Sequence, residues 1–369
     1  MKILLLSDSD SPHTIRWAKS LSNRGIEIGI FSIHKPNIQL YSDTNQIKLF
    51  SSNVQREIQG KKEASLIKLV YFKAIGKLRK TIKLFKPDIV HAHYISSYGL
   101  LGSLVKFHPY IISVWGSDIY NFPKKSFLHF LLIKYNLRKA DLILSTSNIM
   151  AVETKKYTKK EIGITPFGIQ LNKFYPQEVT NVFGSENIVI GTVKTLEKKY
   201  GIEYLIRAFK AVKDKIPDIP IKLLIVGRGS LTDKLKNLTT KLELIEHTIF
   251  TGYINSEMIE KYHNMLDIAV YPSIEDSESF GVSVLESSAC EKPVIVSDVG
   301  GLPEVVADGI TGIIVEPKNP SHLAVAIEKL ILDPRLRIEM GKKGRERVIN
   351  DYDWDKCVLM MIEFYKRFL

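Results

Sequence analysis

The segment ESFGVSVLESSACEKPVIVSDVGGLPE, residues 278 to 304, holds two glutamates, Glu278 and Glu286, around the start of a predicted helix. Gly281 lies between them and permits close backbone approach at the first helical turn, where unpaired N–H groups and the helix dipole favour an anion. Glu286 would lie about one and a half turns into this helix, where its carboxylate can accept hydrogen bonds from vicinal ribose hydroxyls. Two ordinary solvated acids would show the same spacing.

Short apolar runs alternate with helix-length amphipathic segments on both sides of this segment. Runs that are apolar throughout predict parallel strands with helices on both faces of the sheet. There are too many for one sheet of ordinary size, so we expect an α/β protein with two Rossmann-like domains facing a central cleft, and a ligand at the carboxyl ends of the strands. The predicted strands are 2–7, 26–31, 88–93, 110–115, 141–146, 187–193, 221–227, 247–252, 267–273, 293–298 and 312–317.

The change between the two predicted domains falls in a polar stretch that contains proline and glycine, residues 167–187. We therefore expect one domain over 1–172 and a second over 173–352. The end of the chain, about 353–369, reads as an amphipathic helix with no strand after it, and its pattern alone allows it to pack on either domain.

Composition limits the class of protein. The chain has 369 residues, of which 45% are hydrophobic and 25% charged, as in globular proteins that dissolve in water. Its two cysteines, Cys290 and Cys357, exclude a disulfide framework and a cysteine-rich zinc site, and they favour a reducing compartment. No apolar run approaches the length of about 18 residues that a membrane span needs. We expect a cytoplasmic protein that is soluble or peripheral on the inner face of the cell membrane.

The net charge of +12 is concentrated in places, above all in residues 61–86, which carry nine basic residues and one acid. Apolar residues recur there at helical spacing. A packed helix with a solvated lysine face would give this pattern, and so would a basic amphipathic surface that binds anionic lipid headgroups. Because no recognition motif accompanies the charge, we do not expect nucleic acid as a partner.

Two further segments have the form of anion-binding turns. Lys194, Lys198 and Lys199 crowd a loop between a strand end and a helix start, which suits a phosphate group as well as it suits a solvated loop. The strand end at Gly227 and Gly229 resembles a nucleotide-binding turn, but it lacks the third glycine of the dinucleotide fingerprint. It therefore does not indicate NAD and is equally consistent with a tight strand-to-helix turn.

The segment at 278–304 resembles the signature of glycosyltransferase family 4, a group of retaining enzymes with the GT-B fold. That signature is E-x7-E, a buried strand and a G-G-x-P-E turn, which stand here at 278–286, 293–295 and 300–304. The resemblance extends over nearly the whole chain through SPH at 11–13, PDIVHAHY at 87–94, SVWGSD at 113–118 and the lysine loop. It implies that the terminal helix joins the N-terminal domain.

The resemblance implies that the second domain binds a nucleotide-diphosphate sugar. Glu286 would hold the ribose, and Glu278 would contact hydroxyls of the transferred sugar. Lys194, which stands where the family usually has arginine, and Lys199 would neutralise the departing diphosphate. One extra residue in the loop makes Lys198 the alternative to Lys199. The donor-binding set consists of Glu286, the backbone near Phe280, Gly281 and Val282, and the strand end at Gly227.

In the first domain the resemblance assigns His93 to face the donor sugar, with His91 as the alternative. Two histidines at i and i+2 on a strand point the same way, so a metal pair is conceivable, but no third ligand is close in sequence. Trp115 replaces the histidine of the commoner H-G-S-D form. The acceptor-side candidates are His13, Ser117 and Asp118, although Asp118 could be a plain helix cap and His13 a surface histidine.

We therefore expect a retaining glycosyltransferase that needs no metal and no cofactor. It would move a hexosyl unit from a nucleotide-diphosphate sugar to a glycan or lipid-linked acceptor in the synthesis of cell-surface polysaccharide or glycolipid. The alternatives are a GT-B sugar-nucleotide 2-epimerase and a non-catalytic GT-B binding subunit. The 2-epimerase would need acids and histidines set for proton abstraction, whereas the intact glutamates and lysines weigh against the binding subunit.

Overall fold

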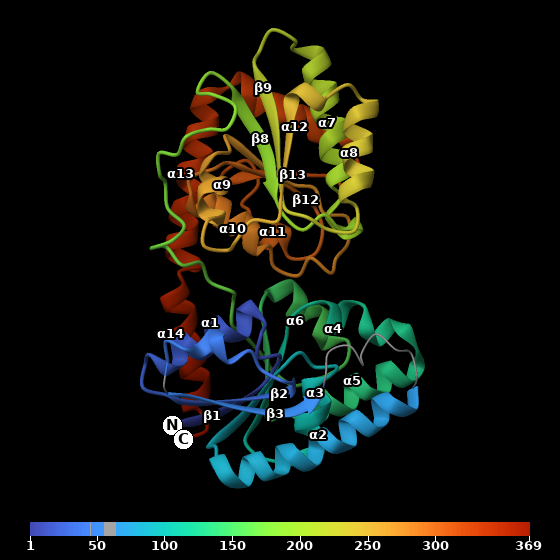
Figure 1. Cartoon of the computed structure of the whole chain (residues 1–369), viewed down its shortest axis with the longest axis vertical. Coiled ribbons are helices and arrows are strands. Elements are labelled where there is room, and N and C mark those ends of the chain that lie inside the picture. The colour runs from blue at the N-terminus through green and yellow to red at the C-terminus, as the bar shows by residue number, and fades with distance from the viewer. Residues whose placement is uncertain (45, 55–63) are drawn as a thin grey trace. The chain divides into compact units, whose positions relative to one another are not determined.

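The computed structural model describes residues 1–44, 46–54 and 64–369. The chain divides into two compact units. Unit 1 consists of Met1–Thr165 and Val358–Leu369, and unit 2 consists of Pro166–Cys357. Each unit has its own parallel sheet with helices on both faces, as Figure 1 shows.

Unit 1 has a seven-stranded parallel sheet in the order β3-β2-β1-β4-β5-β6-β7. Its strands are apolar and buried on both faces, so the main apolar cluster lies between the sheet and its helices. The strands are β1 (Lys2–Leu6), β2 (Glu27–His34), β3 (Ile47–Val54), β4 (Ile89–His93), β5 (Tyr110–Val114), β6 (Leu142–Ser145) and β7 (Ile162–Ile164). The helices between them are α1 (Pro12–Ser22), α2 (Ala64–Phe85), α3 (Tyr98–Val105), α4 (Ser117–Tyr120), α5 (Phe127–Lys139) and α6 (Asn148–Lys155).

Unit 2 repeats this plan with six parallel strands in the order β10-β9-β8-β11-β12-β13. The strands are β8 (Ile188–Val193), β9 (Ile221–Val226), β10 (Thr248–Gly252), β11 (Ile268–Tyr271), β12 (Val294–Ser297) and β13 (Gly312–Val315). The helices are α7 (Ile202–Lys215), α8 (Thr232–Lys241), α9 (Ile259–Asn264), α10 (Val282–Ala289), α11 (Leu302–Val305), α12 (Pro320–Leu332) and α13 (Pro334–Asp351). These two sheets confirm the predicted α/β class with two Rossmann-like domains.

The strand order reverses at one place in each sheet, and that place positions the candidate site. In unit 1, β1 lies between β2 and β4, so the chain leaves β1 toward one edge and later continues from β4 toward the other. In unit 2, β8 lies between β9 and β11 in the same way. Loops at the carboxyl ends of such strands diverge and leave room for a ligand. The predicted site residues lie at or after the carboxyl ends of β1, β4 and β5 in unit 1, and of β8, β9 and β11 in unit 2.

The crossing between the units lies at Thr165 and Pro166, seven residues before the expected boundary at 172. The reason is that the next residues already bind unit 2. The Ile169 backbone accepts a hydrogen bond from Trp354 N at 3.0 Å and donates one to Tyr352 O at 2.7 Å. The Phe167 ring also packs edge-on against Phe280. The last helix, α14 (Trp354–Lys366), begins in unit 2 and belongs to unit 1 from Val358 on.

Two strands were not predicted, β3 and β7. β3 ends in the polar run SSNV, and β7 has only three residues around a glycine, so neither shows a long apolar run. Both are edge strands, which are less buried and therefore carry a weaker apolar signal. All eleven strands that the sequence predicted are present.

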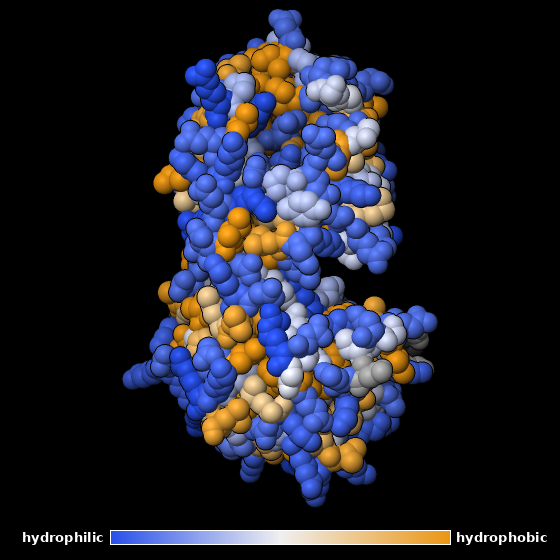
Figure 2. Space-filling view, turned by 90° about the vertical axis from the view of Figure 1, so that its left-hand side faces the viewer, coloured by the Kyte–Doolittle hydropathy of each residue, from blue (hydrophilic) through white to orange (hydrophobic). Residues whose placement is uncertain are grey.

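The face of the molecule drawn in Figure 2 is mainly hydrophilic, with apolar residues in separate patches. Over the described ranges, no helix is both long enough and apolar enough to cross a membrane. The predicted basic segment 61–86 contains all of α2, but residues 61–63 and the side chains up to 72 lie outside the described residues. Further along α2, Lys73, Lys80 and Lys83 are exposed.

Candidate active site

Lys194 and Glu278 form a nearly buried ion pair in unit 2. Lys194 follows β8 and Glu278 lies in the loop after β11, so neighbouring strands bring them together. Lys194 Nζ lies 3.0 Å from Glu278 Oε1, and the side chains are 15% and 9% exposed. Burial lowers the pKa of Lys194, but attraction to Glu278 and Tyr200 outweighs it, so the pKa is raised overall. Lys194 is therefore a firmly held cation at neutral pH.

Tyr200 brings the second predicted lysine to the same place. Its ring centroid lies 4.5 Å from Lys194 Nζ and 4.7 Å from Lys199 Nζ. An aromatic face attracts cations and tolerates two of them near each other. The backbone of Lys199 also accepts a hydrogen bond from Ile274 N at 2.8 Å, which joins the lysine loop to the loop after β11. Lys199 and Lys194 thus both contact the Tyr200 ring, and which of Lys198 and Lys199 would contact a diphosphate stays a prediction.

The backbone of Gly227 packs against the backbone of Lys194. Its φ is +128°, and a Cβ there would lie 2.1 Å from the carbonyl oxygen of Lys194. Only glycine lets the two backbones approach this closely. The predicted turn at the end of β9 is therefore a packing turn that fixes the lysine loop, and the part of Gly227 in donor binding stays a prediction.

The helix start predicted at Gly281 is present. Gly281 has a φ of +88° and caps α10, whose first amides lack helical carbonyl partners and so face the loop that precedes the helix. Phe280 anchors this turn, because its buried ring packs edge-on against Phe167 and Tyr352, at centroid distances of 6.0 and 5.7 Å. Val282 follows as the first residue of α10. The three predicted diphosphate-binding residues thus form one turn with fixed geometry.

The glycine pair of the G-G-x-P-E turn holds the acidic loop. Gly301 N donates to Glu278 O at 2.8 Å, and Gly300 N donates to Asp276 Oδ1 at 3.3 Å. Glu278 N in turn donates to Glu275 O at 3.1 Å. The loop that carries Glu278 is therefore fixed by backbone contacts on both sides.

Glu286 contacts a buried histidine that sequence reasoning missed. His263, on α9, is fully buried, and its Nε2 lies 3.4 Å from Glu286 Oε2. Its Nδ1 is hydrogen-bonded to Ser287 Oγ at 2.8 Å, and Ser287 Oγ is hydrogen-bonded to Tyr271 OH at 2.8 Å. A lone histidine in an amphipathic helix gives no sequence signal, and only the fold brings α9 beside α10.

In unit 1, His93 lies in an aromatic cluster at the end of β4. Its ring centroid is 4.5 Å from that of Trp115 and 4.6 Å from that of His91, and the His13 ring centroid lies 5.9 Å from that of Trp115. Burial, with a smaller contribution from the charge of His13, lowers the pKa of His93 to about 3, so this imidazole is neutral at pH 7. Its buried Nδ1 has no hydrogen-bond partner among the described residues.

The alternative histidine, His91, is fully engaged. Its Nδ1 is hydrogen-bonded to Tyr365 OH at 2.7 Å and its Nε2 to Ser113 Oγ at 2.8 Å. Burial holds its pKa well below the ordinary value. His91 therefore fastens α14 to the sheet of unit 1. Within residues 1–44, 46–54 and 64–369, no group of three or more His, Cys, Asp or Glu side chains is arranged to hold a metal ion.

The two remaining acceptor-side candidates have different environments. Asp118 is fully buried and accepts hydrogen bonds from the amides of Ile95, Trp115 and Gly116 at 2.9, 3.2 and 2.8 Å. Burial raises its pKa to about 6, against the lowering effect of these bonds. Asp118 thus ties together the loops after β4 and β5. Ser117 is hydrogen-bonded through Oγ to the hydroxyl of Tyr94, which is only partly buried.

Comparison with known proteins gives the family. Residues 2–147 match the family model "Glycosyl transferase 4-like", and residues 177–347 match "Glycosyl transferases group 1". The capsular polysaccharide biosynthesis glycosyltransferase CapM of Staphylococcus aureus is 30% identical over 90% of this chain and 92% of its own length. Two other curated relatives are matched over 52% of their length.

Solved structures share the fold over the full length of the chain. Sucrose-phosphate synthase from Thermosynechococcus elongatus superposes with a TM-score of 0.82 and is 21% identical, over 100% of this chain and 98% of its own. Anabaena HepE in complex with UDP-glucose superposes with a TM-score of 0.78 and is 19% identical, over 100% of both chains. The two family matches, the CapM alignment and the paired parallel sheets show that the chain belongs to the group 1 glycosyltransferases and is a transferase with the GT-B fold.

Proposed function

We propose that the protein transfers a hexosyl unit from a nucleoside-diphosphate sugar to a glycan or lipid-linked acceptor, with retention of the anomeric configuration and without a metal ion. The observation that carries this proposal is the ion pair between Lys194 and Glu278, next to the loop that leads into α10. CapM, by its name, acts in capsular polysaccharide synthesis, and HepE binds UDP-glucose. These two proteins support a nucleoside-diphosphate sugar as the donor and a polysaccharide or glycolipid as the product here.

The donor would lie along the turn at the start of α10. The amides near Phe280, Gly281 and Val282 would bind the diphosphate, since a helix start attracts anions. Lys194 and Lys199 would neutralise the charge that develops on the diphosphate, which is the part a metal ion plays elsewhere. A phosphate competing for Lys194 would release Glu278 from its ion pair. Glu278 could then accept hydrogen bonds from hydroxyls of the sugar.

Glu286 would bind the ribose hydroxyls, and Nε2 of His263 would orient the Glu286 carboxylate. A neutral histidine has one N–H, and a carboxylate can only accept. If Nε2–H points at Glu286, then Nδ1 accepts from Ser287 and Ser287 accepts from Tyr271. This chain of donors would hold Glu286 in one orientation.

In the reaction, the bond between the sugar C1 and the diphosphate oxygen breaks as the bond from the acceptor oxygen to C1 forms on the same face. The acceptor proton goes to the departing phosphate oxygen. Glu278, released from Lys194 by the donor, would accept hydrogen bonds from the sugar and would not act as a nucleophile paired with an acid. His93, neutral by virtue of its lowered pKa, would face the sugar from unit 1, and His13, Ser117 and Asp118 would shape the acceptor side.

Incubation with a panel of nucleoside-diphosphate hexoses tests this proposal. We expect one donor to release nucleoside diphosphate with an acceptor far faster than without it, equally in the presence of EDTA, and a product whose anomeric NMR signal keeps the configuration of the donor. An epimerised nucleotide sugar would instead indicate the 2-epimerase, and binding without turnover the non-catalytic subunit. Lys194→Gln should lose transfer, whereas Lys236→Gln, an exposed lysine on α8, should keep it.

We also propose that the protein works in the cytoplasm, on the inner face of the cell membrane, through the basic surface of α2. Its exposed Lys73, Lys80 and Lys83 are available to anionic headgroups. A lipid-linked acceptor would then be at hand where the protein is bound.

A further inference from the structure

A cavity of about 650 Å³ opens on unit 1 between the second half of α5 and the segment that joins α6 to β7. Leu131 and Tyr135 contribute apolar surface to its wall. None of the described residues that line it is acidic. Six of the ten are cations: Lys134, Arg138, Lys155, Lys156, Lys159 and Lys160.

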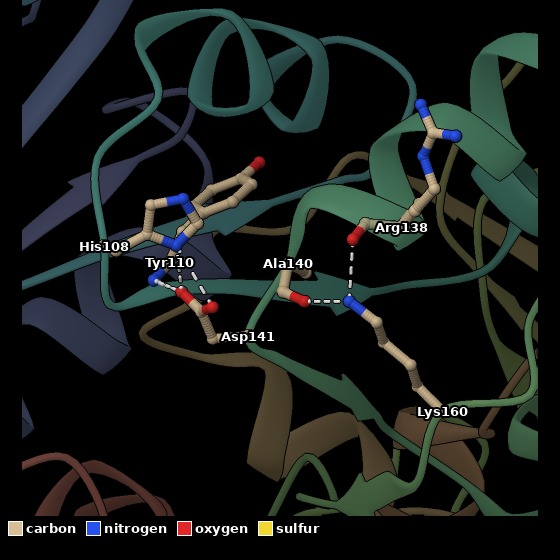
Figure 3. Close-up of polar contacts among 6 residues, drawn as sticks. All are labelled: His108, Tyr110, Arg138, Ala140, Asp141 and Lys160. Atoms are coloured by element: carbon tan, nitrogen blue, oxygen red, sulfur yellow. Dashed lines mark hydrogen bonds and ion pairs between the residues drawn. The ribbon is translucent and has the colours of Figure 1, made fainter.

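The cations at the edge of the cavity are held by the backbone. Lys160 Nζ donates to the carbonyl oxygens of Arg138 and Ala140, at 2.7 and 2.5 Å, at the end of α5 (Figure 3). Lys155 Nζ donates to Lys160 O at 2.8 Å. These bonds fasten the segment before β7 to the end of α5, so the cavity is a fixed feature of the fold and not a chance arrangement of side chains.

The positive charge of the cavity is largely uncompensated. Glu153 pairs with one of the six cations, Lys156, at 2.5 Å. Asp141 attracts Lys160 but is itself bound to His108 at 2.8 Å and to Tyr110 N at 2.7 Å (Figure 3). Lys134, Arg138 and Lys159 have no ion pair with a carboxylate of the residues that the structure describes. Like charges gathered around one cavity repel each other, and a bound anion relieves that repulsion.

The cavity is separate from the candidate active site. It lies where α5 ends and β6 begins and where α6 leads into β7, which is the edge of the sheet at the amino ends of the strands. His93 is the last residue of β4, and Asp118 follows the carboxyl end of β5. Because all these strands are parallel, the two places lie at opposite edges of the same sheet.

We propose that this cavity binds an anion that carries several phosphate groups. Arg138 offers a planar fork that matches two phosphate oxygens, and the lysines add point charges around it. A volume of about 650 Å³ is within the range of small-molecule sites and admits more than one phosphate group. The phosphates could belong to a soluble compound or to a lipid headgroup, and the exposed Leu131 at the rim is compatible with both.

Titration of the full-length protein with inorganic tripolyphosphate, followed by calorimetry, tests the proposal. The double variant Arg138→Gln/Lys159→Gln removes two cavity cations whose side chains are exposed and support no other described contact. The double variant Lys236→Gln/Lys241→Gln removes the same charge from the exposed surface of α8. We expect the cavity variant to bind tripolyphosphate at least about tenfold more weakly than the wild type, and the control to bind it unchanged.

Two further arms separate the possible sites and sources. Lys194→Gln should keep the tripolyphosphate affinity if the cavity, and not the candidate donor site, binds it. Vesicles of phosphatidylcholine with and without phosphatidic acid identify the source: loss of phosphatidic-acid binding in the cavity variant alone indicates a lipid headgroup, and unchanged vesicle binding indicates a soluble phosphate compound. Equal tripolyphosphate affinity in the cavity variant and the control, or loss of binding only in Lys194→Gln, overturns the proposal.

Discussion

His263 is the residue that most changes how Glu286 is understood. From the sequence, Glu286 is an acid on a helix face, but in the structure its carboxylate lies 3.4 Å from a buried imidazole whose other nitrogen is hydrogen-bonded. Nε2 has no hydrogen-bond partner among the described residues, so a hydrogen bond from it to Glu286 would fix that carboxylate, as a partner behind a metal-binding histidine does. The position of Glu286 thus depends on α9 and β11 as well as on its own helix.

A matched pair of variants tests this support. The side-chain amide of His263→Gln can occupy the place of Nε2 and still donate toward Glu286, whereas that of His263→Asn occupies the place of Nδ1. We expect nucleoside-diphosphate affinity to stay near that of the wild type in the Gln variant. It should fall in the Asn variant by up to the about 1–3 kcal/mol expected for Glu286→Ala. Equal affinities in the two variants, measured by calorimetry, would argue against the role of Nε2.

The two buried histidines of β4 should make the stability of the fold depend on pH. Burial lowers the pKa of His93 to about 3 and that of His91 well below its ordinary value, so the unfolded chain takes up these protons first as pH falls below about 6.5. Stability is then lost at about 1.4 kcal/mol per pH unit for each histidine. Asp118 acts in the opposite direction, since its pKa is raised to about 6 and the folded state takes up its proton first.

We therefore expect wild-type stability to decline between about pH 6 and pH 4 more steeply than that of His93→Gln, by the contribution of one histidine. Urea denaturation at several pH values measures this difference in slope, to which acids elsewhere contribute equally in both proteins. Parallel curves would contradict the assignment of a neutral, buried His93.

At the scale of the elements, the lysine loop and the acidic loop are held by glycines whose purpose the sequence did not reveal. Gly227 and Gly229 fit a nucleotide-binding turn in sequence, and in space Gly227 lies against Lys194 O. The pattern could not show this, because the contact joins two loops more than thirty residues apart. The pairing of Lys194 with Glu278 was hidden for the same reason, although each residue was identified.

Gly227→Ala tests the supporting role of this turn. A Cβ at this position would meet the carbonyl oxygen of Lys194, so the loop must shift. Gly309 also has a positive φ, +69°, but open space around it, so Gly309→Ala is a control for backbone strain alone. We expect Gly227→Ala to lower both the melting temperature and the donor affinity, and Gly309→Ala to cost about 1 kcal/mol of stability with donor affinity kept. Equal donor affinity in both variants would contradict the role of Gly227.

At the scale of the whole molecule, the class and the two-domain plan were predictable, because buried parallel strands are apolar throughout and stand out between amphipathic helices. The exact residue at which the chain passes from unit 1 to unit 2 was not predictable, because Phe167 and Ile169 lie in a polar stretch. They join unit 2 through a ring contact and a backbone bridge. The edge strands β3 and β7 were missed because they are short or end in polar residues. The cavity of unit 1 was hidden because its cations come from two segments that only the fold brings together.

The net charge of +12 leads to a prediction about membranes. The triple variant Lys73→Gln/Lys80→Gln/Lys83→Gln should bind anionic liposomes more weakly than the wild type, and wild-type binding should fall steeply with added salt. A sedimentation assay measures both, with Lys236→Gln/Lys241→Gln/Lys342→Gln as the charge-matched control on unit 2. Equal loss in the two variants, or equal binding of the wild type to neutral vesicles, would contradict attachment through α2.

The central claim is that unit 2 binds a nucleoside diphosphate through Lys194 and Glu286, and a thermal-shift screen of nucleoside diphosphates tests it most directly. A ligand at about one hundred times its Kd stabilises the folded state by about 2.7 kcal/mol. We expect one of UDP, GDP or ADP to raise the melting temperature of the wild type, and this rise to be clearly smaller in Glu286→Gln and in Lys194→Gln. No rise with any nucleoside diphosphate, or the same rise in both variants, would contradict it.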